Sequence, residues 1–257
     1  MENIKYFKSK YFNNKKFIYG FFSRKGGYSR KHLKSLNCSM SNKDSKNNVI
    51  KNRKKSQKAL GLEKTKLKFI NQIHSNKIYM INKKNINKPL VGDAIITSTS
   101  DISLAILTAD CAPIFLIDIK NNLICAIHSG WRGSYNDIVH KTINKIKQTK
   151  KNNRLIAIIG PCLDQKNFEV DKKFYYKFLK KNLLYKKFFI KKSIKYLFDM
   201  RGLLRYQLLK YGVKKVINIK LNTYSKKTLF FSHRRSKQNN QNYSGRMINI
   251  LGFSQKI

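Results

Sequence analysis

The sequence predicts a single α+β domain of mixed β-sheets flanked by helices, covering residues 1–257. The chain is long enough for one large domain with a sizeable core, and no Pro- or Ser-rich linker divides it. Short apolar runs rich in Ile and Leu, which are typical of buried strands, occupy the middle of the chain. Helical patterns interrupt these runs in mixed order rather than strict alternation, which favours α+β. A hydrophobic fraction of 41% excludes a disordered protein.

The predicted strands are short and end at turn residues. An aromatic strand is expected at 17–22, before the turn at Gly26 and Gly27. Residues 67–73 and 77–81 are expected to form a strand pair. Buried strands are expected to follow at 94–98, 103–109, 113–119, 123–128 and 155–160, with a late strand at 216–221.

Helix signals appear before and after the central strands. The polar, lysine-rich stretch 38–58 leads into a helix that ends near Gly61. A second helix is expected from Ser134, where Asp137 completes a pair like a capping box. The predicted inward stripe of this helix consists of Ile138, Val139, Thr142, Ile143 and Ile146.

The second half of the chain adds three more predicted helices. One is expected from about Asp171, and Asp199 should N-cap the next, with Gly212 at its end. The last helix is expected to start near Gly245. The helix that Asp199 caps should direct four leucines inward, namely Leu203, Leu204, Leu208 and Leu209.

The net charge of +44 has two interpretations. A basic surface attracts polyanions, so a non-catalytic RNA-binding protein is one hypothesis. Only ten of the 56 basic residues are Arg, however, and the lysines are spread over the whole chain. Asn, Ile, Phe and Tyr are also abundant, as drift in an A+T-rich genome would produce. Specific nucleic-acid readers usually favour Arg, so the pattern favours drift.

The sequence also bears on compartment and redox state. No apolar run reaches the roughly 18–20 residues that cross a bilayer, and the basic N-terminal stretch lacks the apolar core of a signal peptide. The expected compartment is therefore cytoplasmic, with no membrane partner. The four cysteines, expected to be reduced there, form no CxxC pair of the kind found in structural zinc modules: Cys38, Cys111, Cys125 and Cys162.

Three reactive side chains are expected at the ends of apolar strands. His74 ends one such segment, Cys111 ends another, and His128 ends a third. A strand fixes the backbone while the side chain at its end reaches open space. Two imidazoles and one thiolate suit Zn²⁺, and three protein ligands leave a fourth position for water or substrate. Each residue alone is as readily a packed core group, so the hypothesis depends on all three meeting.

Two other chemistries fit the same residues. In a thiol hydrolase Cys111 would act as the nucleophile and His128 as its base. A type 1 copper site also takes two histidines and one cysteine, but a multicopper oxidase needs several further histidine-rich centres. Five histidines in the whole chain are too few for that. Laccase-type polyphenol oxidation is therefore disfavoured, while copper binding at the three residues stays open.

A second constellation indicates an anion-binding site. Residues 130–133, with Arg132 among them, lie between a predicted strand and a predicted helix, where backbone N–H groups can face an anion. Arg24 and the run 233–235 could add positive charge. The alternative is that the glycines serve a tight turn and the arginines are solvated.

Short motifs follow one another from about Phe17 to Leu251. They are QIH (72–74), GDA (92–94), LTADCAP (107–113), AIHSGWRG (126–133), IGPC (159–162), FEV (168–170), DMR (199–201), TY (223–224), FSHRR (231–235) and GR (245–246). Through these motifs the chain resembles the laccase-domain family. That family was long labelled polyphenol oxidases and is now understood as purine nucleoside phosphorylases with adenosine deaminase activity.

The resemblance implies an α/β/β/α arrangement of layers and a metal held by His74, Cys111 and His128. It implies phosphorolysis of adenosine, inosine and methylthioadenosine to the free base and a sugar 1-phosphate, with deamination of adenosine as a second activity. The expected cofactor is Zn²⁺, with copper as the alternative. The expected partners are purine nucleosides and phosphate, without a specific nucleic acid, for a monomer or homodimer.

The reaction assigns hypothetical roles to further residues. A phosphate dianion needs fixed positive charge, for which Arg132, Arg24 and Arg235 are candidates. Asp93 is grouped with these as a substrate-binding residue. Asp93 or Asp110 could transfer protons, and Asp110 is favoured because it precedes Cys111.

The chain also departs from the family's motifs at positions outside the three ligands. Residues 164–167 stand where the family often carries another cysteine. Phe168 replaces a Tyr, Asn222 a common Cys, and His233 the Tyr of the last aromatic motif. These departures bear on secondary cysteines and on substrate preference.

Overall fold

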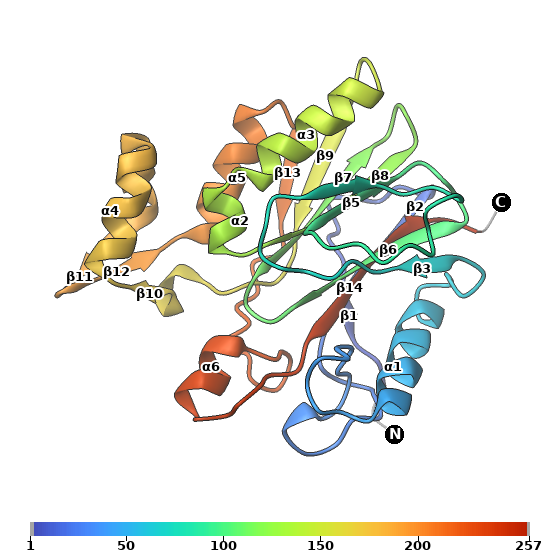
Figure 1. The fold of residues 1–257 in the computed structure, drawn as a ribbon, viewed down its shortest axis with the longest axis horizontal. Coiled ribbons are helices and arrows are strands. Elements are labelled where there is room, and N and C mark those ends of the chain that lie inside the picture. The colour runs from blue at the N-terminus through green and yellow to red at the C-terminus, as the bar shows by residue number, and fades with distance from the viewer. Residues whose placement is uncertain (1–2, 256–257) are drawn as a thin grey trace.

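Two mixed β-sheets packed face to face form the centre of the protein (Figure 1). The computed structural model describes residues 3–255. The five-stranded sheet has the order β1-β2-β14-β6-β3, with bounds Tyr6–Phe7, Phe17–Phe22, Met247–Phe253, Ile102–Thr108 and Lys66–Lys68. The six-stranded sheet has the order β13-β9-β7-β8-β5-β4, with bounds Lys215–Asn218, Leu155–Ile159, Ala112–Asp118, Leu123–Ser129, Ala94–Thr97 and Ile78–Met80. Both sheets contain parallel and antiparallel pairs, which confirms the mixed α+β prediction.

Helices cover the outer faces of the two sheets (Figure 1). The six-stranded sheet carries α2, α3 and α5, with bounds Trp131–Tyr135, Ile138–Thr149 and Met200–Lys210. The five-stranded sheet carries α1, which spans Lys46–Lys58. The layers are therefore helix, sheet, sheet and helix. Within residues 3–255 no helix has both the length and the apolar character to cross a membrane.

A third, smaller sheet projects from the central layers, at the left of Figure 1. Its antiparallel order is β10-β12-β11, with bounds Glu169–Val170, Lys195–Phe198 and Phe189–Lys192. The helix α4 (Lys172–Lys181) packs against it through aromatic rings. The remaining elements are α6 (His233–Gln238) and 3₁₀ turns at Lys31–Leu33, Gln165–Asn167 and Leu183–Phe188.

The space between the two large sheets is filled by aromatic and branched side chains. Phe21 of β2 stacks on Phe115 of β7, with ring centroids 4.6 Å apart, and both rings are fully buried. Gly160 makes this stacking possible, because a Cβ there would lie 2.3 Å from the Phe21 ring. Burial on both faces explains why β7 and β8 read as continuous apolar runs rather than as alternating patterns.

Two of the predicted strands do not pair as expected. The stretches 67–73 and 77–81 contribute β3 and β4, which lie in different sheets. β3 ends at Lys68 because the chain then leaves the sheet, and the Gln72 side chain bonds the backbone N–H and C=O of Leu107 instead. The prediction of a strand pair was therefore wrong.

The helix after β8 begins earlier than predicted and is broken. α2 starts at Trp131 rather than at Ser134, and α3 starts at Ile138. Asp137 lies between them in the left-handed region (φ 57°), and its carboxylate accepts a bond from Lys181 instead of capping the helix. The predicted inward stripe of α3 is confirmed as buried.

The last two differences lie near the C-terminal end. Leu209, predicted to face inward, is 40% exposed at the end of α5, whereas the other three leucines are buried. No helix begins at Gly245. Residues 247–253 form β14, a fully buried strand between β2 and β6, because an apolar run in the sheet interior is covered on both faces.

Replacing Phe115 by Ala tests the core between the sheets. Loss of the ring leaves a cavity beside Phe21, and the free energy of unfolding should fall by about 3–5 kcal/mol in urea denaturation. Leu183→Ala, at a side chain that is 78% exposed, is the control and should change it by less than about 0.5 kcal/mol. Equal losses in the two variants would contradict this account of the core.

Candidate metal centre and active site

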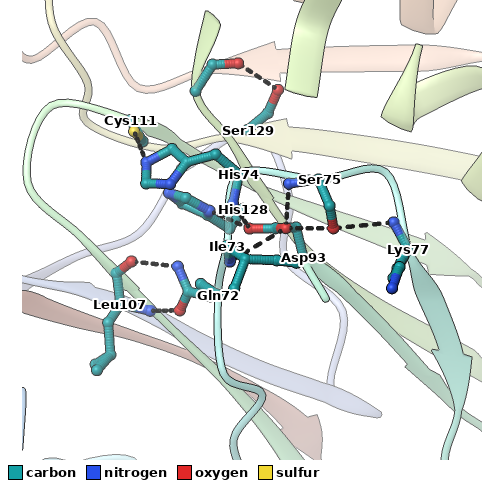
Figure 2. A network of polar contacts seen from close by, with 11 residues as sticks. Gln72, Ile73, His74, Ser75, Lys77, Asp93, Leu107, Cys111, His128 and Ser129 are labelled. Atoms are coloured by element: carbon teal, nitrogen blue, oxygen red, sulfur yellow. Dashed lines mark hydrogen bonds and ion pairs between the residues drawn. The ribbon is translucent and has the colours of Figure 1, made fainter. Parts of the chain in front are cut away.

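The three predicted ligands come together in the structure. The ligand atoms of His74, Cys111 and His128 all lie within 4.8 Å of one another. Nε2 of His74 lies 3.7 Å from Sγ of Cys111, and the two imidazole rings meet edge to face at 4.9 Å (Figure 2). Residues separated by up to 54 positions in the chain thus share one cluster, here called the triad.

Each ligand is positioned by a different local feature. His128 lies within β8, and Cys111 lies at the turn from β6 to β7, directly after Asp110 with its positive φ of 84°. His74 was expected at the end of a strand, but it lies in a loop after β3, with a φ of 60°. The sheet fixes two ligands, and a loop must be held in place to supply the third.

Gly130 allows the ligands to approach one another. A Cβ at this position would lie 2.8 Å from Sγ of Cys111 and 3.2 Å from the His74 ring. Its φ of −86° is open to any residue, so close contact and not backbone conformation requires glycine here. Gly130, the first glycine of the AIHSGWRG motif, therefore leaves room for the triad and also precedes the first residue of α2.

Asp93 holds two of the three ligands in place (Figure 2). Its side chain is fully buried, and Oδ1 accepts a 2.8 Å hydrogen bond from Nδ1 of His128. The same oxygen accepts the backbone N–H of His74 at 3.0 Å, and Oδ2 accepts from the backbone and hydroxyl of Ser75. The structure therefore replaces the predicted substrate-binding role of Asp93, because a fully buried side chain cannot reach a substrate.

The charges of the triad are strongly coupled. Burial alone would raise the pKa of Cys111, but the charge of His128 and the hydrogen bonds of His128 and His74 outweigh it and lower this pKa to about 6. Burial opposes the charged form of His128, yet the Cys111 thiolate and the Asp93 hydrogen bond raise its pKa to about 9. Without a metal, these opposite pKa shifts both favour the pair of thiolate and imidazolium.

This donor set fits a divalent ion. Because Nδ1 of His128 donates to Asp93, the other ring nitrogen faces the triad, which is the carboxylate–histidine arrangement common behind zinc ligands. The lowered pKa of Cys111 favours the thiolate that a metal binds, and a bound cation would take the place of the proton on His128. Three protein donors are the number that catalytic zinc sites use.

Two cavities meet at the triad, and His74, Cys111 and His233 line both. The first encloses about 620 Å³, and its further lining includes Ser41, Arg53, Phe69, Gln72, Leu107, His128 and Arg246. The second encloses about 520 Å³, and its further lining includes Trp131, Arg132, Phe168, Glu169, Phe174 and Arg234. A substrate of two parts could therefore occupy both cavities with its reacting atoms near the triad.

The structure brings only one of the three predicted phosphate-binding arginines to these cavities. Arg132 lines the second cavity, with its guanidinium 4.7 Å from the Trp131 ring centroid. Arg24 and Arg235 line a separate cavity that contains no triad residue, so they are not placed to hold a phosphate that reacts at the triad.

Asp110 is near the triad, but its carboxylate is already engaged. It accepts hydrogen bonds from the Thr223 hydroxyl at 2.7 Å, the Ser232 hydroxyl at 2.9 Å and the backbone N–H of Arg234 at 2.7 Å. These contacts tie the β6–β7 turn to the segment before α6. The geometry supports a positioning role rather than the predicted proton transfer.

Sequence reasoning missed part of the cavity lining. His233 and Arg234 were noted only as part of a basic run and of the FSHRR motif, without a role in the site. Arg53 and Arg246 were not identified as site residues. The GR motif did contain Arg246, which lies in the first cavity. Burial lowers the pKa of Arg246, and the charges of Cys111 and Asp110 only partly oppose this shift. No local signal marks Arg53, since it sits in a lysine-rich helix and reaches the cavity only through the fold.

Comparisons with known proteins identify the family. The model described as multi-copper polyphenol oxidoreductase laccase matches residues 18–254, and the chain belongs to this family. A purine nucleoside phosphorylase of Rickettsia conorii is 36% identical over 186 residues, 71% of this chain and 76% of the relative. Purine nucleoside phosphorylase YlmD of Bacillus subtilis is 27% identical over 263 residues, 95% and 91% of the two chains.

Solved structures share the fold. A Neisseria meningitidis protein superposes with a TM-score of 0.84 at 25% identity, covering 98% of this chain and 99% of that one. YlmD of Geobacillus stearothermophilus superposes with a TM-score of 0.83 at 23% identity, covering 93% and 92%. The α+β fold and the resemblance seen in the sequence are both confirmed.

The word multi-copper in the family description is not matched by the donors found here. Among residues 3–255 the triad is the one cluster of three or more His, Cys, Asp or Glu donors. The two histidines that do not line the cavities at the triad pack on aromatic rings instead. The His32 ring lies tilted against Tyr243, and the His140 ring stacks on Tyr211. A multicopper oxidase requires several centres, whereas the described donors accommodate one ion, zinc or copper.

Asp93→Asn tests the support of the triad. The amide cannot accept every hydrogen bond that the carboxylate accepts, so Zn²⁺ affinity should fall about 10–100-fold in competition with a chelating dye. Asp118→Asn is the matched control, because Asp118 is equally buried but lies at the opposite end of β7 from Cys111. There it accepts hydrogen bonds from Asn121, Asn153 and the backbone of Arg154. Unchanged zinc affinity in Asp93→Asn would contradict the supporting role.

Proposed function

We propose that this chain is a metal-dependent purine nucleoside phosphorylase. Adenosine, inosine or methylthioadenosine would react with phosphate to give the free purine and a sugar 1-phosphate. The observation that carries the proposal is the meeting of two chemically different cavities at the triad. The names of the curated relatives support it independently.

The first cavity suits the phosphate. Its lining contains Arg53 and Arg246 but, among the described residues, no Asp or Glu. Both guanidiniums are anchored, because Arg53 donates to the Cys38 carbonyl at 2.9 Å and Arg246 to the Ser244 carbonyl at 2.9 Å. Fixed arginines hold a dianion without the entropy loss of ordering a free side chain.

The second cavity suits the nucleoside. Trp131, Phe168 and Phe174 line it with aromatic surface, which stacks favourably on a purine. Glu169 provides a carboxylate that can accept hydrogen bonds from ribose hydroxyls. Arg132 lies in the same lining and is retained as a second candidate to contact the phosphate as it approaches the sugar.

The reaction can be assigned to these parts. A phosphate oxygen forms a bond to C1′ of the sugar, the bond from C1′ to the purine nitrogen breaks, and the purine leaves with the electron pair and takes up a proton. Arg53 and Arg246 orient the phosphate, and the second cavity holds the sugar between phosphate and purine. His233, which lines both cavities, can hydrogen-bond the departing base. A Zn²⁺ ion held by the triad would supply a Lewis acid at this junction.

Deamination of adenosine is proposed as a second activity. It replaces the purine amino group by oxygen from water and releases ammonia, giving inosine. A purine in the second cavity would lie beside Cys111 and His74, so both reactions can use one binding mode. The activation of water by zinc is the chemistry that known zinc deaminases use.

A thiol hydrolase is the second candidate function, and one observation favours it. Cys111, His128 and Asp93 are arranged as nucleophile, base and orienting carboxylate, and the lowered pKa of Cys111 favours its thiolate. Such an enzyme would work without metal and would be inactivated by alkylation of Cys111.

The central prediction concerns inosine and phosphate. Purified protein loaded with Zn²⁺ should release hypoxanthine and ribose 1-phosphate from inosine only when phosphate is present, as followed by liquid chromatography. Cys111→Ala should abolish both bound zinc and this release. Base release that needs no phosphate, or none at all, would refute the phosphorylase.

A second prediction separates the two cavities. Arg246→Gln removes a positive charge from the first cavity, so the KM for phosphate should rise about tenfold or more, while the KM for inosine changes little. Arg205→Gln, which removes a charge on the exposed side of α5, is the control. An equal effect on both KM values would contradict the assignment of phosphate to the first cavity.

A further inference from the structure

A third cavity lies behind the wall of the active site. It encloses about 310 Å³ and shares no lining residue with the two cavities at the triad. The segment 231–235 forms the partition between them. His233 and Arg234 face the triad cavities, whereas Ser232 and Arg235 face the third one.

The lining of this cavity is basic and carries no carboxylate among the described residues. Arg24, His32, Lys227 and Arg235 contribute its ionisable groups. The other polar side chains are neutral donors and acceptors, namely Thr228, Ser232, Ser236, Asn239, Gln241 and Ser244. Such a lining favours an anion that also accepts hydrogen bonds.

The two arginines are held close together despite their like charge. Burial and the charge of Arg235 together lower the pKa of Arg24 to about 10. The charge of Asp110 acts on Arg235, but this carboxylate lies outside the cavity lining and already accepts three hydrogen bonds, two of them from the partition. A bound anion would relieve this repulsion from within the cavity.

Both guanidiniums are also fixed in orientation. Arg24 donates to the carbonyls of Lys34, His32 and Lys227. Arg235 donates to the carbonyls of Thr223, Tyr224 and Phe230. Each guanidinium has five N–H groups, so these contacts with described residues leave two on each for a ligand.

We propose that this third cavity is a second phosphate-binding site, which takes a phosphate monoester or inorganic phosphate apart from the reaction at the triad. Guanidiniums that are held in place and keep unused N–H groups match the tetrahedral oxygens of a phosphate, and the exposed Lys227 in the lining adds a point charge. The volume lies at the lower end of the roughly 300–1,000 Å³ of small-molecule sites, which leaves room for a sugar attached to the phosphate.

The test compares Lys227→Glu with Lys226→Glu. Both make the same charge change at neighbouring exposed positions, but only Lys227 lines the cavity, so the loss of general electrostatic attraction is matched. Isothermal titration calorimetry near physiological salt, with inorganic phosphate and with ribose 5-phosphate, should show about tenfold or greater weakening of one site in Lys227→Glu. Lys226→Glu should stay within about twofold of the original protein.

A second matched pair avoids dependence on one position. Asn239→Asp places a carboxylate in the cavity lining, whereas Asn240→Asp places one outside it. Cys111→Ala should still bind phosphate in the third cavity, so this site can be tested independently of the phosphorylase activity. Tighter binding of ribose 5-phosphate than of phosphate would identify the monoester as the ligand, and the reverse order would identify inorganic phosphate. Equal weakening within each pair, or no saturable binding, would overturn the proposal.

Discussion

The candidate active site depends on the buried carboxylate of Asp93. One oxygen of this side chain bonds both the His128 ring and the backbone N–H of His74, and the other holds Ser75. The two imidazoles come from a sheet and from a loop, and no strand pairing holds that loop at His74. Gln72 ties the start of this loop to β6, but the Asp93 carboxylate bonds the His74 backbone itself. Without this carboxylate His74 would no longer be joined to His128, and the triad would lose the geometry that a metal requires.

How much of this was predictable differs between parts of the structure. The central strands and the three ligands could be read from the sequence, because long apolar runs and reactive groups at their ends are local signals. The loop at His74, the exposed Leu209 and the strand at 247–253 could not, because each is decided by which surface covers it. The role of Arg53 could not be predicted either, because packing between distant segments places it in the cavity beside the triad.

The segment 231–235 shows how one short motif can serve two sites. Ser232 and Arg235 line the third cavity, whereas His233 and Arg234 between them line the triad cavities. Asp110 holds the segment in place through hydrogen bonds from the Ser232 hydroxyl and the Arg234 backbone. The turn that presents Cys111 is thereby joined to the wall between the cavities. The sequence indicated a family motif and positive charge in this run, but only the fold shows which side chain lines which cavity.

The large positive charge is explained best by separating its two residue types. Six of the ten arginines line the three cavities, where their guanidiniums contact backbone carbonyls or aromatic rings: Arg24, Arg53, Arg132, Arg234, Arg235 and Arg246. Among the far more numerous lysines of residues 3–255, only Lys68, Lys88 and Lys227 line these cavities. Drift toward lysine would add charge wherever a solvated side chain is tolerated, but it could not supply planar, anchored donors. The net charge of +44 is therefore a poor guide to function, whereas the few arginines mark the places where an anion is expected.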